Sequence, residues 1–383
     1  MFIAAGCLCL AIWVYLLVFH GRFWQISRFK SDISMAVVGD AIAVVVPARN
    51  EADVVAQSIS SLLKQRHVDR LHVYLVDDGS MDGTAEVAKR AARETVSAAV
   101  LTVISGRSLP PGWSGKLWAV QQGVEAALQF DPKFILLTDA DIVHGSESIS
   151  TLASIAQSGS YDLVSFMVKL YCRTLAERAL IPAFVYFFFQ LYPPAWISDP
   201  GKRTAGAAGG SILIRPDALE RAGGIAGIRG EVIDDCALAR SVKQSGGRVW
   251  LGVTDETRSL RPYESFGEIG RMISRSAFNQ LRHSGFLLSL ATVGMLVTYL
   301  LPPILAIFSR HILSATLGTL AWMLMATSFY PIIRFYKLNA LWSFTLPLIA
   351  LFYLGATLHS AFKFWTGKGG EWKGRVQDRK AEN

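Results

Sequence analysis

Two aspartates lie two residues apart at the end of an apolar run, in the stretch LLTDADIVH at residues 136–144. Side chains at positions i and i+2 of an extended segment point the same way, so Asp139 and Asp141 can face one cation. Carboxylates this close repel each other unless positive charge lies between them. Because oxygen ligands without Cys or His suit Mg²⁺ or Mn²⁺, we expect a divalent metal that carries a diphosphate. The alternative is a solvated turn whose aspartate caps the next helix.

Polar segments follow three of the four apolar segments that are typical of buried strands. The predicted strands cover 41–47, 71–78, 100–105 and 134–141, and the predicted helices cover 54–65, 83–94 and 116–130. This alternation predicts a parallel sheet covered on both faces, in which ligands bind beyond the carboxyl ends of the strands. The polar segments that fall there are PARNE at 47–51, DDGS at 77–80 and DAD at 139–141.

Phosphate binding at this edge cannot use the usual glycine loops, since the chain has neither GxxxxGK[ST] nor a strand-led GxGxxG. Lys116 begins a predicted helix, where a cation is unfavourable to the helix dipole unless an anion lies nearby. We therefore expect Lys116 to lie beside the diphosphate, with a solvated lysine as the alternative.

The composition predicts a membrane protein, because 51% of the 383 residues are hydrophobic. Uncharged runs at 2–19, 285–309, 312–333 and 338–362 are each near or above the roughly 18 to 20 residues that cross the hydrocarbon. The first run lacks the basic segment and the cleavage site of a signal peptide, so we expect a retained transmembrane anchor over 1–21. We expect about three further transmembrane helices over 285–362 and a basic tail over 363–383.

Basic residues at the ends of these runs predict the orientation of the chain. They follow the first run and precede the second, as Arg22, Arg28, Lys30, Arg271, Arg275 and Arg282. The positive-inside rule then places residues 22–284 in the cytoplasm, in a multi-pass protein of the inner membrane. Three further spans would leave the basic tail outside, which the positive-inside rule disfavours. The run with Pro302 and Pro303 is therefore a candidate for a kinked or re-entrant segment that does not cross fully.

Charge and cysteine content bear on partners and compartment. The net charge is +8, but the basic residues gather beside the apolar runs and in the tail, which favours anionic lipid headgroups and an anionic substrate over nucleic acid. The four cysteines show neither CxxC spacing nor a disulfide framework. A reducing compartment is therefore expected.

Four segments in residues 40–283, VVVPARNEADVVAQSISSLLKQ, VYLVDDGSMDGTAEVA, GKLWAVQQGVEAA and ILLTDADI, carry a resemblance to a known family. In order and spacing they resemble family 2 glycosyltransferases, whose α/β fold is the Rossmann-like GT-A fold of nucleotide-diphospho-sugar transferases. The resemblance implies a cytosolic GT-A domain, which we place at 40–284. It implies nucleotide contacts from Pro47, Arg49, Asn50, Glu51, Asp77 and Asp78. A helix cap at Asn50 and a simple turn at 79–80 are the alternatives.

The second half of the domain matches further features of the family. A glycine-rich segment at 204–225 resembles one that approaches donor sugar and acceptor, which implies this role for Gly209, Gly210 and Ser211, with close strand packing as the alternative. The family pattern of Glu-Asp, two residues and Leu maps onto 234–238, and its second acid is the general base. Asp235 is therefore the expected catalytic base, while Asp234 in place of Glu leaves the choice between the two aspartates open.

Two segments near the apolar runs bear on the reaction. Processive members carry QxxRW, but here Met272 and Ser276 replace Gln and Trp and only Arg275 matches. We expect a single transfer, with Arg275 as a diphosphate contact or as a charge flanking the membrane. The segment at 179–197, which prolines interrupt, is expected to lie at the interface and admit lipid, with a core helix as the alternative.

The expected activity is therefore an inverting, metal-dependent, non-processive transfer of one sugar from a nucleotide-diphospho-sugar, a UDP-sugar, to a hydroxyl of a membrane lipid. The whole chain looks most like the hopanoid-biosynthesis-associated branch of family 2. Ceramide and polyprenyl phosphate are alternative acceptors, because enzymes acting on them would have the same motifs. A transporter or scaffold is a third hypothesis, although only His359 places an ionisable group within the C-terminal runs.

Overall fold

The computed structural model describes residues 2–26, 38–367, 371–372 and 375–376. The chain divides into a sheet unit, 27–171 with 196–261, and a helical unit, 1–26 with 172–195 and 262–383. The division assigns 172–195 and 262–284 to the helical unit, whereas the sequence motifs placed both inside a domain at 40–284.

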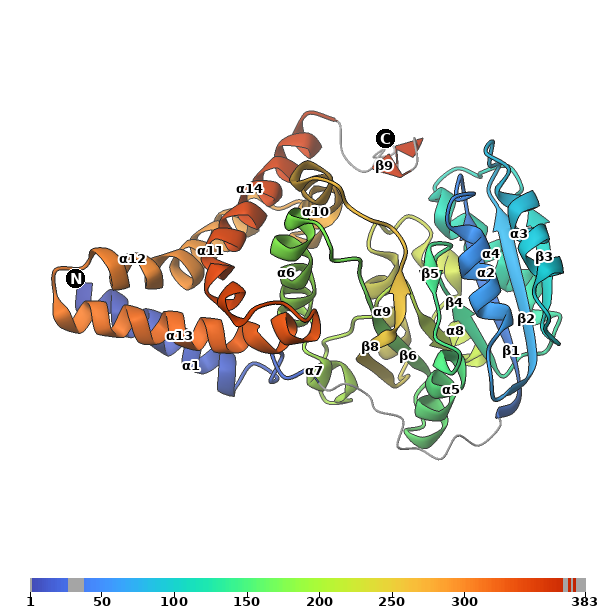
Figure 1. The fold of residues 1–383 in the computed structure, drawn as a ribbon, viewed down its shortest axis with the longest axis horizontal. Coiled ribbons are helices and arrows are strands. Elements are labelled where there is room, and N and C mark those ends of the chain that lie inside the picture. The colour runs from blue at the N-terminus through green and yellow to red at the C-terminus, as the bar shows by residue number, and fades with distance from the viewer. Residues whose placement is uncertain (1, 27–37, 368–370, 373–374, 377–383) are drawn as a thin grey trace. The chain divides into compact units, whose positions relative to one another are not determined.

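The first half of the sheet has the alternating order that the sequence predicts. Strands β1 (Val38–Ala48), β2 (Val68–Asp77), β3 (Val100–Ser105) and β4 (Phe134–Leu137) are parallel, in the order β3-β2-β1-β4 (Figure 1). Helices α2 (Val55–Leu63), α3 (Thr84–Glu94) and α4 (Gly115–Leu128) connect them. The carboxyl ends of β1, β2 and β4 therefore lie at one edge of the sheet.

The second half corrects the prediction of a wholly parallel sheet. Strands β7 (Ile212–Ile214), β6 (Leu163–Lys169), β8 (Val249–Ser259) and β5 (Ile142–Val143) extend the order beyond β4, and β7 runs antiparallel to both β4 and β6. Strand β5 is also antiparallel to β8, while β6 and β8 are parallel. The direction of β7 could not be predicted because its three residues are all buried, and a short apolar run looks the same in either direction.

Helices cover both faces of this mixed sheet. Ile42, Val44 and Val46 of β1 share a core cluster with residues of α2, α3 and α5 (Ser148–Ser158). On the other face, α4 approaches β1 so closely that a Cβ added at Gly123 would lie 2.4 Å from Val45 Cγ1. Beyond β7 the unit contains α8 (Pro216–Arg221), a 3-10 turn at Ile225–Ile228 and α9 (Asp234–Gln244).

The helical unit is built mainly from apolar helices. It contains α1 (Phe2–Val18), α6 (Leu175–Leu191), α10 (Phe266–Gln280), α11 (Gly285–Met295), α12 (Leu301–Phe308), α13 (Ile312–Phe335) and α14 (Leu346–Trp365), with a 3-10 turn at Ala340–Thr345. Helix α7 (Pro194–Ser198) lies at the boundary of the two units, and Glu371–Trp372 (β9) pairs with Arg375–Val376 (β10). Helix α1 packs along α13 (Figure 1).

Four described helical stretches are long and apolar enough to cross a membrane, by length and composition alone. They are Leu175–Ser198, Gly285–Phe308, Ile312–Phe335 and Ala340–Trp365. Three of them correspond to the runs predicted within 285–362. The first is the segment that the sequence assigned to the membrane interface, and it is the most buried of the four. The predicted anchor at the amino end forms α1, whose 17 residues make a shorter apolar helix.

The stretch with two adjacent prolines contains a π-helical turn, while its kinked or re-entrant course in a membrane stays a prediction. A π-helical turn at Leu296–Leu300 joins α11 to α12, just before Pro302 and Pro303. Because proline has no N–H, these residues leave carbonyls of the preceding turn without a helical donor. The Trp13 indole N–H donates to one of them, the carbonyl of Thr298, at 2.9 Å. Helix α1 therefore helps to stabilise the irregular turn.

Candidate active site

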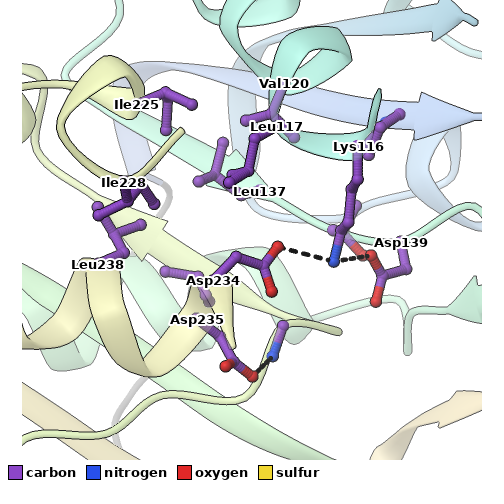
Figure 2. Close-up of a pocket in the computed structure, with 14 residues that line it drawn as sticks. Lys116, Leu117, Val120, Leu137, Asp139, Ile225, Ile228, Asp234, Asp235 and Leu238 are labelled. Atoms are coloured by element: carbon purple, nitrogen blue, oxygen red, sulfur yellow. Dashed lines mark hydrogen bonds and ion pairs between the residues drawn. The ribbon is translucent and has the colours of Figure 1, made fainter. Parts of the chain in front are cut away.

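A pocket in the sheet unit brings together residues from six segments. It is lined at the carboxyl ends of β1 and β4 by Pro47 and Asp139, at the start of α4 by Lys116, by Gly209 before β7, by the 3-10 turn at Ile225–Ile228, and at the start of α9 by Asp234 and Asp235. Apolar side chains form its other side, namely Leu117, Val120, Leu137, Ile225, Ile228 and Leu238 (Figure 2). Charged groups thus lie against an apolar wall, as in many ligand sites.

Lys116 lies between two carboxylates. Its Nζ is 2.9 Å from Asp139 Oδ1 and 3.1 Å from Asp234 Oδ2 (Figure 2). Ser114 caps helix α4 by accepting from the N–H of Leu117, which holds Lys116 in the first turn. Burial alone would lower the pKa of Lys116, but the two carboxylates raise it above its ordinary value. The lysine is therefore a fixed positive charge whose neighbours here are protein carboxylates, and the diphosphate contact of Lys116 stays a prediction.

Asp235 is held by two backbone N–H groups. Its Oδ2 accepts from Gly209 at 2.9 Å, and its Oδ1 accepts from Cys236 at 2.7 Å. Burial and the neighbouring charge of Asp234 raise the pKa of Asp235 to about 6, while Lys116 opposes the rise. Its position at the start of α9 would by itself favour the charged form. The net direction is upward, because burial and Asp234 outweigh Lys116 and the two N–H groups.

The three residues predicted to approach the donor sugar and the acceptor lie in different surroundings. A Cβ at Gly209 would lie 3.6 Å from both Asp235 Oδ2 and Lys116 Nζ. A Cβ at Gly210 would lie 3.0 Å from Val168 Cγ2, which is the close packing noted as the alternative for this segment. Ser211 is fully buried. Of the three, Gly209 lies among the charged groups.

The two aspartates of the DAD stretch have different protein partners. Asp139 pairs with Lys116, whereas Asp141 Oδ2 lies 3.3 Å from Arg261 Nε and 3.2 Å from Ser259 Oγ. Arg261 also forms an ion pair with Glu51, whose side chain is largely buried. Arg261 is not among the site residues predicted from the sequence. The only signal for it was its place after a long strand, β8, which the predicted elements do not include.

Metal binding requires oxygen ligands beyond those of one aspartate. In the part of the chain that the structure describes, no group of three or more His, Cys, Asp or Glu could hold a metal ion. Mg²⁺, however, is commonly bound by one or two carboxylates together with substrate phosphates. Asp139 and Asp141 fit that role by chemistry, provided that a bound diphosphate supplies further oxygens.

Several residues predicted to border the nucleotide make contacts between the loop after β1 and the loop after β2. Asn50 Oδ1 accepts from the N–H of Met81 at 2.9 Å, and Asp77 Oδ1 accepts from the N–H of Ser80 at 3.0 Å. The guanidinium of Arg49 lies 3.6 Å from the carboxylate of Asp78. The loops after β1 and β2 are thus bonded to each other, and the nucleotide contacts of these residues stay predictions.

The sequence comparison assigns the chain to a family. The sequence model described as "Glycosyltransferase like family 2" matches residues 40–279. This chain belongs to that family.

Relatives with curated descriptions match only part of the chain. An uncharacterized protein, MJ1222, of Methanocaldococcus jannaschii is 31% identical over 124 residues, 32% of this chain and 45% of its own length. An undecaprenyl-phosphate 4-deoxy-4-formamido-L-arabinose transferase of Pseudomonas savastanoi pv. phaseolicola is 30% identical over 129 residues, 32% of this chain and 34% of its own. An N-acetylglucosaminyltransferase of Rhizobium leguminosarum bv. viciae is 32% identical over 138 residues, which are 36% of this chain and 30% of its own length. The matches span less than half of each relative.

A solved structure supports the fold. The mannosyltransferase PcManGT of Pyrobaculum calidifontis, in complex with GDP-Man and Mn²⁺, aligns with a TM-score of 0.56 over 94% of this chain and 99% of that chain. Since the two are 17% identical, the likeness concerns the fold alone. The sheet unit of this family 2 glycosyltransferase is thus a mixed, GT-A-like α/β fold.

One residue assigned by the family resemblance lies outside the sheet unit. Arg275 is exposed on α10 in the helical unit, together with Arg271, whereas the other predicted site residues belong to the sheet unit. The buried side of α10 packs on α14, and there Ser274 Oγ donates to the carbonyl of Ala356 at 3.0 Å. The diphosphate role and the membrane-flanking role of Arg275 both remain predictions.

Proposed function

We propose that this family 2 glycosyltransferase transfers a single sugar, with inversion, from a nucleotide-diphospho-sugar to a hydroxyl group of a membrane lipid. The observation that carries the proposal is the approach of Asp235, Lys116 and Asp139 around Gly209 in one pocket. This arrangement offers a base for the acceptor and a positive charge for the donor within one small volume.

Asp235 is the proposed base. A carboxylate whose pKa is raised to about 6 is ionised at neutral pH yet is a stronger base than an ordinary aspartate. It would accept the acceptor proton while the acceptor oxygen attacks the sugar carbon that bears the diphosphate. Asp234 is occupied by Lys116, so its carboxylate is less available for proton transfer.

Lys116, Asp139 and Asp141 are the proposed donor side. Mg²⁺ or Mn²⁺, when held by Asp139 and Asp141, would supply positive charge against the departing diphosphate. Lys116 adds a charge of the protein's own that the two neighbouring carboxylates keep in place. For Asp141 to hold the metal, its contact with Arg261 must break, or its carboxylate must contact the arginine and the metal together. UDP is the proposed nucleotide.

The membrane lipid acceptor is supported by the apolar helices. Four described helical stretches could cross a membrane, and the proposed setting is the inner membrane, crossed several times, with the sheet unit in the cytoplasm. A hopanoid acceptor is proposed from the resemblance of the whole chain to that branch. Ceramide is a further hydroxyl acceptor of the same class.

A polyprenyl phosphate acceptor is a second candidate, favoured by the partial match to an undecaprenyl-phosphate sugar transferase. A phosphate with a second pKa of about 6 is already largely ionised at neutral pH. Such an acceptor does not need a protein base. The two acceptor classes therefore differ in how strongly activity depends on Asp235.

Membranes that contain the full chain provide the test. They are incubated with labelled nucleotide sugars, Mg²⁺ or Mn²⁺, and in parallel with a lipid extract containing hopanoids, with ceramide or with polyprenyl phosphate. A labelled lipid that forms with the native chain and not with Asp235→Asn supports a hydroxyl acceptor. Absence of transfer from every donor would refute the proposed activity, and flux across proteoliposomes without transfer would favour the transporter hypothesis.

A further inference from the structure

The loop that presents Gly209 is held from both sides by buried hydroxyl groups. Residues 207–211 lead directly into β7, which lies between β4 and β6. Thr138 follows β4 and Ser165 belongs to β6, and both side chains are fully or almost fully buried. Each hydroxyl contacts the backbone of this loop.

Thr138 makes the contact on the β4 side. Its hydroxyl donates to the carbonyl of Gly210 at 2.8 Å and lies 2.9 Å from His144 Nε2. A hydroxyl has one proton, and the Gly210 carbonyl can only accept, so His144 must donate from Nε2. Burial lowers the pKa of His144 to about 3, which agrees with a neutral ring in this tautomer. His144 thus orients the Thr138 hydroxyl toward the loop.

Ser165 makes the contact on the β6 side. Its Oγ accepts from the N–H of Ala208 at 2.9 Å and lies 3.0 Å from the carbonyl of Ser211. The backbone is therefore bonded to buried side chains on both sides of Gly209, one residue before it and one residue after it. Between these fixed points the Gly209 N–H donates to Asp235 Oδ2.

We propose that Thr138 and Ser165 form a hydroxyl clamp that positions Asp235 for proton transfer by fixing the direction of the Gly209 N–H. Both are proposed as positioning residues, because their hydroxyl groups bond to the backbone of the loop, although Thr138 also lines the pocket. This inference rests on the proposed function, in which Asp235 is the base.

The clamp has a consequence for the acidity of Asp235. The groups that face this carboxylate are Asp234 beside it on α9, Lys116 on α4 and the N–H groups of Gly209 and Cys236, and Asp139 also lies near Gly209. A donated hydrogen bond stabilises the carboxylate and so lowers its pKa. If the loop loosens and the Gly209 N–H turns away, the pKa of Asp235 rises. The acidic limb of the rate profile then moves to higher pH.

The experiment compares Thr138→Val, which removes the hydroxyl at nearly constant shape, with Thr138→Ser, which keeps it. For Thr138→Val we expect kcat to fall about 10- to 100-fold, the scale expected for misplacement of a reacting group. We expect the donor KM to stay within about twofold and the acidic limb to move upward. Thr138→Ser should restore most of kcat and the native limb. The control is Thr151→Val, which removes a buried hydroxyl of α5 that donates to the backbone carbonyl of Glu147.

Equal losses in Thr138→Val and Thr138→Ser, or an unshifted acidic limb in Thr138→Val, would overturn the clamp. So would a changed metal requirement, because Thr138 would then act through its neighbour Asp139. If Thr138→Val fails to fold by circular dichroism, Ser165→Ala must give the same shift, and its absence refutes the proposal. Asp235→Asn is assayed in parallel. Native activity in that variant defeats the base assignment, whereas an inactive Asp235→Asn beside an unaffected Thr138→Val defeats only the clamp.

Discussion

Arg261 Nε lies 3.3 Å from Asp141 Oδ2, although 120 residues separate the two in sequence. The second aspartate of the DAD stretch therefore has a protein cation as its neighbour, and Glu51 shares the same guanidinium. A divalent metal at Asp141 must compete with this arginine. This competition can be measured by removing either the carboxylate of Asp141 or the guanidinium of Arg261.

Removal of the carboxylate is the first prediction. Asp141→Asn should abolish transfer and weaken nucleotide binding in the presence of Mg²⁺ or Mn²⁺, because one ligand fewer leaves too few oxygens for a hard cation. Calorimetric titration with the nucleotide diphosphate, with and without metal, measures the loss. Turnover of the native protein in a chelator would contradict the metal assignment.

Removal of the arginine is the second prediction. Arg261→Gln should increase the affinity of the donor-free protein for Mn²⁺ by about tenfold, since two acidic side chains lose the cation between them. Electron paramagnetic resonance of free Mn²⁺ reports this binding without any turnover. Arg258→Gln, an exposed change near the end of β8 and three residues before Arg261, should leave the affinity unchanged. A weaker affinity in Arg261→Gln would show that the arginine supports the site instead.

The third prediction concerns the base. Asp235→Asn keeps the shape of the side chain but removes the proton acceptor, so transfer to a hydroxyl should fall by roughly 10² to 10⁴-fold. Nucleotide affinity should stay near native, as titration of the same preparation would show. Asp234→Asn should reduce activity less. The reverse order of the two variants would assign the base to Asp234.

The pH dependence is the fourth prediction. Because burial and Asp234 raise the pKa of Asp235 to about 6, the base is protonated below this pH and ionised above it. The ratio kcat/KM should therefore rise with pH through about 6 and level off toward neutral pH. A profile of initial rates measures this limb. A limb near the ordinary aspartate pKa of about 4 would be inconsistent with the buried environment.

Gly209 and Gly210 provide the fifth prediction as a matched pair. Gly209→Ala places a methyl group 3.6 to 3.8 Å from the polar atoms of Asp235, Lys116 and Asp139, so it should lower kcat by about tenfold or more at little cost in stability. Gly210→Ala brings a methyl group to 3.0 Å from Val168, and overpacking of this kind costs about 1 to 3 kcal/mol. Rates and thermal melts are measured on both variants. Gly209→Ala should lower mainly the rate, and Gly210→Ala should lower mainly the melting temperature.

The sequence by itself determined the part of the fold that local patterns encode. Short apolar runs separated by amphipathic segments predicted the four parallel strands and their helices, because the side-chain periods of 2 and 3.6 residues are properties of neighbouring positions. The polar residues at 47–51, 77–80 and 139–141 could be placed at one sheet edge for the same reason, since parallel strands end together.

Only the tertiary structure decided which charges meet. The antiparallel course of β7 brings Gly209 to Asp235, and the end of β8 brings Arg261 to Asp141. Such pairings join residues that are far apart in sequence, and they follow from strand order and direction, which a short buried strand does not encode. The raised pKa of Asp235 is of the same kind, because it depends on the burial of its carboxylate and on the charges that the fold places around it.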